Sequence, residues 1–219
     1  MFVRILKLFQ WIKDSISLQI LKSISSILFP SLVWRKESCQ KKIWLTFDDG
    51  PTTEVTSFIL EVLKAENIKA TFFLVGKEIE KYPDLFNAII TDGHIIGNHS
   101  YSHKSGWSCN NFTYFNDIEK CQKLMPENKI FRPPYGRISP LQIKEIQKKY
   151  KIILWDVLSW DFSLNTTPQK VKKNVLRNTK DGSIIVFHNN QKSFKNLKPI
   201  LQEIIQALKN KGYNFCTTW

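Results

Sequence analysis

From residue 41 onward, short runs of apolar residues alternate with longer stretches whose apolar positions recur at helical spacing. Runs of four to seven apolar or β-branched residues predict buried strands, and spacing of three or four predicts helices. The expected strands are 42–47, 69–75, 94–97, 152–157, 183–187 and 214–217. The expected helices are 53–66, 76–91, 113–124, 140–150, a helix that begins at residue 168, and 195–211.

Repeated strand–helix alternation predicts an α/β fold with a parallel sheet. Most residues with notable chemistry come directly after expected strands, where parallel sheets and barrels carry their sites. They are Asp48, Asp49, His99, Arg132, Asp161 and His188. This placement alone does not separate a closed barrel from an open, doubly wound sheet.

The first forty residues differ in character from residues 41–219, which we expect to form the folded domain. Apolar residues recur at helical spacing between Ile5 and Ile16, and four basic side chains are opposed by Asp14 alone within the first thirty-four residues. The longest uncharged stretch, Ser23 to Trp34, is too short to span a bilayer, and no signal-peptide pattern is present. This basic amphipathic segment either lies on an anionic membrane surface or packs against the domain.

The composition fits one domain of 219 residues with a full core, since 42% of the residues are hydrophobic. A formal net charge of +13 favours an anionic partner, or a Lys-rich solvated surface. We expect no nucleic-acid partner, because no basic tract alternates with aromatics and no zinc-finger pattern occurs. The four cysteines form no Cys-x-x-Cys pair, so free thiols are expected.

Two short stretches point to metal chemistry. Asp48 and Asp49 are adjacent before a Gly-Pro turn, and His99 and His103 are spaced to share one ion if their segment is helical. Three of these four side chains could bind a metal and leave one carboxylate as a base. The alternatives are an ordinary acidic turn and a chance histidine pair on a surface helix.

Other polar and aromatic residues are harder to interpret alone. His188 ends an apolar strand and is either structural or a catalytic imidazole oriented by Asp161. His94 is expected to hydrogen-bond backbone, and the pattern does not assign a role to Asp156. The side chains of Trp155, Trp160 and Phe162 could fill the core or line a sugar-binding cleft.

Five motifs in order, TFDDGP, HSYSH, RPPYG, WDVLSWDF and IIVFH, resemble those of the polysaccharide deacetylase family with the NodB-homology domain, carbohydrate esterase family 4. The resemblance runs from about residue 41 to the end of the chain. It implies a distorted (β/α) barrel of seven or eight strands. It also implies one divalent metal ion, zinc or in some relatives cobalt, and an acetylated glycan as substrate.

The resemblance implies a role for each matching residue. Asp48 would be the general base, and Asp49, His99 and His103 would bind the metal. Arg132 would hold the base, the backbone N–H of Tyr135 would donate to the oxyanion, and Asp161 would orient His188 as general acid. Substrate contacts are expected from Tyr135, Trp160 and Val186, with Val186 beside the acetyl methyl.

The expected reaction is removal of N-acetyl groups from an N-acetylglucosamine-containing glycan, either peptidoglycan or a chitin-like polymer. An O-acetyl esterase of the same mechanism and a non-catalytic glycan-binding module are the alternatives. Leu158, Phe162 and Asn189 depart from the residues that relatives often carry there, which leaves the cleft shape and the glycan open. This substrate class would place the protein at the cell envelope.

Overall fold

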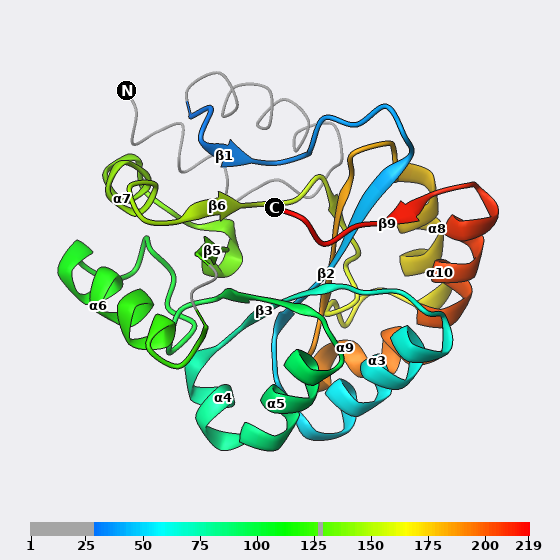
Figure 1. The fold of residues 1–219 in the computed structure, drawn as a ribbon, viewed down its shortest axis with the longest axis horizontal. Helices are drawn as coiled ribbons and strands as arrows, with labels where there is room; N and C mark the ends of the chain where they lie inside the picture. The colour runs from blue at the N-terminus through cyan, green and yellow to red at the C-terminus, as the bar shows by residue number, and fades with distance from the viewer. Residues whose placement is uncertain (1–28, 127–128) are drawn as a thin grey trace.

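The computed structural model describes residues 29–126 and 129–219. Within these residues, parallel strands form one curled sheet in the order β1-β6-β5-β4-β3-β2-β8-β7, and β9 pairs with the start of β2 (Figure 1). The strands are β1 Leu32–Val33, β2 Lys42–Asp49, β3 Thr71–Leu74, β4 Ile95–Asn98, β5 Ile130–Phe131, β6 Lys151–Ile153, β7 Val157–Leu158, β8 Ile184–His188 and β9 Asn214–Phe215. The predicted α/β class and parallel sheet are confirmed.

Helices cover the outer face of the sheet, as Figure 1 shows. They are α3 Thr53–Ala65, α4 Gly76–Lys81, α5 Pro83–Thr91, α6 Asn111–Gln122, α7 Pro140–Ile146, α8 Pro168–Asn178, α9 Gln191–Leu197 and α10 Leu201–Asn210, with a 3₁₀ turn, η1, at Pro134–Gly136. Several begin with a side-chain cap; in α7, Ser139 and Gln142 form a capping box. None of the helices in the described ranges is long and apolar enough to cross a membrane.

Two helices predicted as continuous are each divided by a proline. The expected helix 76–91 consists of α4 and α5, which meet at Tyr82 with φ −131° and ψ 61°. The expected helix 195–211 covers the end of α9 and all of α10, with Pro199 between them, and α9 begins four residues earlier than expected. Proline lacks an N–H and disfavours helical backbone in the residue before it, so the apolar spacing continues where the helix does not.

The expected strand 152–157 is also wrong as one unit, because its two halves pair with opposite sides of the sheet. The N–H of Leu154 donates to Val33, next to β1, and the N–H of Asp156 donates to Ile184 on β8. Residues 154–156 therefore cross from β6 to β7 without a strand ladder. Within the described residues, the edge strands β1 and β7 are not paired with each other in the strand order, and this crossing segment spans the gap between them. The barrel is therefore distorted, as the resemblance implied.

Alternation along the strands separates the core from the barrel interior. On β2, Ile43, Leu45 and Phe47 pack under the helices, while Trp44 belongs to a cluster inside the barrel. That interior cluster is apolar at the amino-terminal ends of the strands and contains Trp44, Phe73, Ile130, Ile153 and Ile184. Toward the carboxyl ends the interior becomes polar, and the candidate site begins there.

Residues 29–40, which precede the predicted domain boundary, contribute β1 and a bridge between Arg35 and Ser183. The predicted amphipathic helix lies outside the described residues, and the division at residue 40 stays a prediction. All four cysteines are free thiols, as expected.

Candidate active site and metal centre

The end of β2 turns its two carboxylates in different directions. Asp48 points into the barrel, where it is 3% exposed, and β2–β8 register pairs it with His188. Asp49 has φ 84°, a left-handed conformation that non-glycine residues rarely adopt. This turn directs Asp49 toward the histidines that follow β4.

The His99–His103 segment is a loop and not a helix, so the helical premise for the shared ion was wrong. Ser100 and His103 have φ values of 63° and 55°, and these two left-handed residues fold the loop back on itself. The loop nevertheless brings both Nε2 atoms to Oδ1 of Asp49, at 3.6 Å for His99 and 3.1 Å for His103. Asn98 fixes the start of the loop by accepting from the N–H of Ser100.

These three side chains fit a divalent metal ion. Their ligand atoms all lie within 4.8 Å of one another. The Nδ1 of His99 lies 2.7 Å from the carbonyl oxygen of Arg132; a carbonyl only accepts, so Nδ1 carries the proton and Nε2 keeps its lone pair. Burial lowers the pKa of His99 to about 4, which keeps the ring neutral near pH 7.

The electrostatics of Asp49 also suit a cation. Burial by itself would raise the pKa of Asp49, but the hydrogen bond with His103 and the nearby His188 lower it below its usual range. An ionised carboxylate with two imidazole nitrogens is a donor set that zinc accepts in catalytic sites.

Arg132 holds Asp48 from inside the barrel. Its side chain is fully buried, and Nη1 donates to Oδ1 of Asp48 at 2.6 Å and to Thr46 at 2.7 Å. Its other donors reach the carbonyl oxygens of Ile153 and Leu154. A buried guanidinium with these partners fixes the Asp48 carboxylate and compensates its charge.

Asp161 and His188 form a second buried pair. Nδ1 of His188 lies 2.8 Å from Oδ1 of Asp161, whose Oδ2 accepts from the backbone N–H of His188 at 2.8 Å. Burial alone would lower the pKa of His188, but the charge and hydrogen bond of Asp161 raise it to about 9. The imidazole is therefore protonated at neutral pH, with Nδ1 occupied by Asp161.

The predicted substrate-contact residues lie beside the candidate metal-binding and catalytic residues. Val186 is fully buried one interior position below His188 on β8. Tyr135 is 61% exposed, has φ 60°, and its ring lies 4.6 Å from that of His103. Trp160 is 40% exposed and lies 5.6 Å from Phe162, whose edge-on ring is 4.6 Å from His188. Trp160 is thus not a core residue.

Two asparagines after β8 belong to the site but were not predicted from the sequence as site residues. The N–H of Asn189 donates to the carbonyl of Asp48 at 2.7 Å, and Nδ2 of Asn190 donates to Oδ2 of Asp49. Asn190 also caps α9 through Ser193. Asparagine after a strand is a common helix cap, so its second partner is visible only in the fold.

The remaining residues named from the sequence have structural roles. His94 accepts from the N–H of Ala70, as predicted. Asp156 accepts from Ser183 and from the N–H of Ile184, so it fixes the crossing between β6 and β7.

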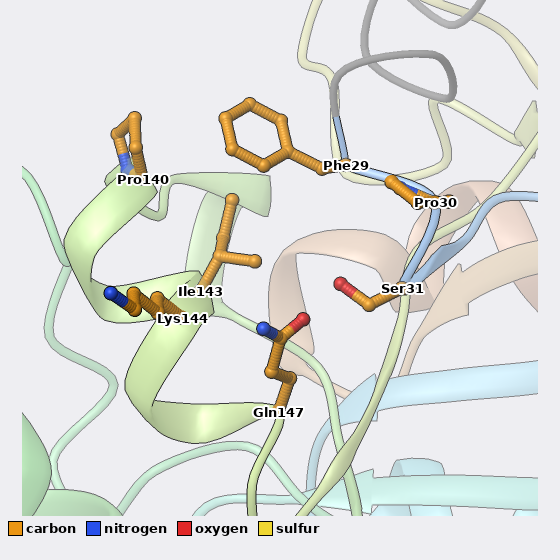
Figure 2. A pocket seen from close by; sticks show the side chains of 7 residues that line it. All are labelled: Phe29, Pro30, Ser31, Pro140, Ile143, Lys144 and Gln147. Atoms are coloured by element: carbon orange, nitrogen blue, oxygen red, sulfur yellow. The ribbon is translucent and has the colours of Figure 1, made fainter.

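A cavity of 330 Å³ lies beside α7, and Figure 2 shows its lining side chains. They are Phe29, Pro30, Ser31, Pro140, Ile143, Lys144 and Gln147. None of the candidate catalytic or metal-binding residues lines this cavity, so it is not part of the site.

The sequence of residues 35–152 matches the polysaccharide deacetylase family. The chain belongs to this family. It is 38% identical over 183 residues to a peptidoglycan-N-acetylglucosamine deacetylase of Bacillus cereus, covering 80% of this chain and 66% of that protein. It is 33% identical over 198 residues to the peptidoglycan-N-acetylglucosamine deacetylase of Listeria monocytogenes, covering 88% of this chain and 41% of that protein.

A crystal structure of a peptidoglycan N-acetylglucosamine deacetylase, solved with 4-naphthalen-1-yl-N-oxidanyl-benzamide, superposes with a TM-score of 0.82. The two chains are 35% identical, and the match covers 88% of this chain and 92% of the other. Because 88% of this chain is matched, the likeness to this structure extends beyond residues 35–152.

Proposed function

We propose that the chain is a metal-dependent deacetylase that removes N-acetyl groups from N-acetylglucosamine residues of a cell-wall glycan. The observation that carries this proposal is the convergence of two catalytic pairs, Asp48–Arg132 and Asp161–His188, beside an Asp-His-His metal-binding cluster. The relatives described above, named as peptidoglycan-N-acetylglucosamine deacetylases, support peptidoglycan as the glycan.

Asp49, His99 and His103 would hold the ion, and their donor set suits zinc. When bound, a divalent cation there polarises the acetyl carbonyl and lowers the pKa of water.

Asp48 is the proposed general base. Arg132 holds one of its oxygens, so the carboxylate has a fixed orientation when it takes a proton from the attacking water. The water oxygen forms a bond to the acetyl carbon, and the carbonyl electrons move to the oxygen. The backbone N–H of Tyr135 would donate to this developing oxyanion.

His188 is the proposed general acid. An amine leaves poorly as an anion, so the carbon–nitrogen bond breaks as the imidazolium gives its Nε2 proton to the nitrogen. Asp161 occupies Nδ1 and stabilises the charged ring before that transfer. The oxyanion electrons re-form the carbonyl as the nitrogen keeps the bonding pair and the new proton, so the products are acetic acid, which ionises to acetate, and the free amino sugar. Asp48 then releases its proton and His188 regains one through solvent, which restores the starting state.

Val186 and Trp160 would shape the binding site around this chemistry. The buried isopropyl group of Val186, below His188, suits the acetyl methyl. The exposed indole of Trp160 can stack on a sugar ring. A cell-wall substrate would place the domain at the cell envelope.

Acetate release tests the proposal. The purified protein, stripped with a chelator and then supplied with zinc, is incubated with peptidoglycan, with N-acetylglucosamine oligomers and with acetylated xylan. We expect zinc-dependent release from the amide substrates. Release that ignores the chelator would contradict the metal mechanism, release from xylan alone would indicate an O-acetyl esterase, and zinc binding without any release would indicate a glycan-binding module.

A further inference from the structure

Arg137 carries a positive charge on the rim of the candidate active site. Its guanidinium carbon lies 5.4 Å from the centre of the Trp107 ring and 5.6 Å from that of Tyr135. The Tyr135 ring in turn lies 4.6 Å from His103, one of the three candidate metal ligands. The charge is therefore one aromatic ring away from the proposed metal ion.

The backbone holds Arg137 in this place. The residue lies between η1 and the capping box of α7, and its carbonyl oxygen accepts from the N–H of Gly106 at 3.1 Å. A Cβ on Gly106 would lie 2.7 Å from that oxygen, so the two segments are in close contact. This contact joins the rim residue Arg137 to the loop that follows His103.

The donors of Arg137 are free for a ligand. Throughout residues 29–126 and 129–219, its guanidinium has neither an ion-pair partner nor a side-chain hydrogen bond, whereas Arg132 five positions earlier has four acceptors. The contacts with Trp107 and Tyr135 are made by the charge of the guanidinium over the two rings and use none of its N–H donors in a hydrogen bond to a carbonyl or carboxylate. The planar fork of N–H donors on a guanidinium matches a carboxylate, which it can bind through two parallel hydrogen bonds.

We propose that Arg137, which lies over the rings of Trp107 and Tyr135, binds a carboxylate carried by a glycan unit next to the sugar that is deacetylated. The proposal rests on the proposed function and narrows its substrate. A glycan in which N-acetylglucosamine alternates with lactyl-substituted sugars presents such a carboxylate beside every acetamide, either on the lactyl group or on a peptide attached to it. A chitin-like polymer presents none.

The test compares Arg137→Gln with the wild-type protein on three alternating glycans and on neutral N-acetylglucosamine oligomers. The alternating glycans carry free lactyl carboxylates, their methyl esters, or peptides on the lactyl groups. On the free carboxylate glycan we expect KM to rise about two- to fivefold with kcat unchanged, the range for one solvent-accessible charged pair. On the neutral oligomers we expect no change.

The esterified glycan completes a double-mutant cycle, in which one change removes Arg137 and the other removes the carboxylate charge of the glycan. Esterification should raise KM for the wild-type protein and leave Arg137→Gln unaffected, because the two changes remove the same interaction. If the Arg137 effect is present only with the peptide-bearing glycan, the bound carboxylate belongs to the peptide. Arg137→Lys keeps the positive charge but loses the two parallel N–H donors of the guanidinium. Its KM on the free carboxylate glycan should therefore lie between those of the wild-type protein and Arg137→Gln.

Lys144→Gln on α7 is the matched control, because it removes one exposed positive charge from the same region without touching the rim. Zinc content and melting temperature should be the same in all variants. An equal loss on neutral and anionic glycans, or an equal effect of Lys144→Gln, would overturn the proposal. If the wild-type protein releases no acetate from any glycan, the proposed function fails, and calorimetric binding of the carboxylate glycan to wild type and Arg137→Gln decides the inference separately.

Discussion

At the scale of single residues, the site depends on how the backbone orients two adjacent carboxylates. Asp48 follows the strand alternation into the barrel and accepts from the buried Arg132. Asp49 takes φ 84° and faces His99 and His103. Two adjacent aspartates thereby lie in different surroundings: Asp48 contacts a buried guanidinium, and Asp49 faces two imidazole rings.

We therefore expect Asp48→Asn and Asp49→Ala to lose activity for different reasons. Asp48→Asn removes the base but no ligand, so deacetylation should fall by about 10²- to 10⁴-fold while zinc remains bound. Asp49→Ala removes a ligand, so bound zinc should be lost together with activity. Zinc content by atomic emission, read beside acetate release, makes the distinction. Near-normal turnover by Asp48→Asn would show that another group is the base.

The second residue-scale prediction concerns the pH dependence set by His188. Its pKa is raised to about 9, so the proposed general acid is protonated at neutral pH and activity should decline as the pH rises through that value. Asp161→Asn removes the charge that raises the pKa, so the alkaline limb of the kcat profile should move to lower pH. If Asp161→Asn lowers kcat at all pH values but leaves the alkaline limb at the same pH, Asp161 has no electrostatic effect on the pKa of His188.

At the scale of elements, the site is built where β2 and β8 end side by side. The turn after β8 contacts three successive residues of the other strand end: Asn189 donates to the carbonyl of Asp48, Asn190 donates to Asp49, and the Asn189 side chain packs on Gly50. Thr56 of α3 donates to Oδ1 of Asn189 at 3.0 Å, which ties the next helix to the same turn. Contacts between the carboxyl-terminal ends of β2 and β8 therefore hold both ends in position.

Gly50→Ala tests this junction. A Cβ at position 50 would lie 2.1 Å from Nδ2 of Asn189, so the Asn189 side chain or one of the two strand ends must move. We expect a loss of about 1–3 kcal/mol in the free energy of unfolding, as for other overpacked sites. Urea unfolding of Gly50→Ala, Asn189→Ala and the double variant measures it. Gly50→Ala should lower the free energy of unfolding clearly less in the Asn189→Ala variant than in the wild-type protein. An equal decrease in both would contradict the proposed clash.

At the scale of the whole molecule, the barrel is filled in layers from an apolar end to a polar one. Trp219 lies beside Trp44 at the amino-terminal ends of the strands, with ring centres 6.2 Å apart, and its indole donates to Thr71. Above this layer come Thr46, Arg132 and Val186, and then the site. Because the three candidate ligands come from the ends of β2 and β4, a bound ion would join two separate strand connections.

Metal binding should therefore stabilise the whole fold. At a free zinc concentration one hundred times the dissociation constant, linkage predicts about 2.7 kcal/mol of added stability. For a chain of this length that corresponds to a rise of roughly 5–10 °C in Tm. Thermal unfolding with chelator and with zinc measures the shift, and His103→Ala, which keeps the fold but loses one ligand, should respond much less. Equal shifts in both proteins would place the ion elsewhere.

The sequence by itself determined the class of fold and the residues of the site. Apolar runs and helical spacing depend on burial of each local segment, so β2, α3, β3 and β8 were predictable one at a time. The five motifs identified the family and, with it, Asp48, Asp49, His99, His103, Asp161 and His188. Their predicted catalytic roles still await the experiments above.

Only the tertiary structure decided how these segments meet. The break between β6 and β7 follows from pairing with strands far away in the chain, which no local pattern records. The sequence predicted that His99 and His103 could share an ion if their segment were helical, but two left-handed residues bring the rings together in a loop. The second partner of Asn190 is likewise a contact across the fold. Only the fold shows that, within the described residues, the side-chain donors of Arg137 have no hydrogen-bond partner. Local sequence patterns record which residues are buried and which carry reactive groups. The geometry of the site depends on contacts between residues that are distant in the chain, which local patterns do not record.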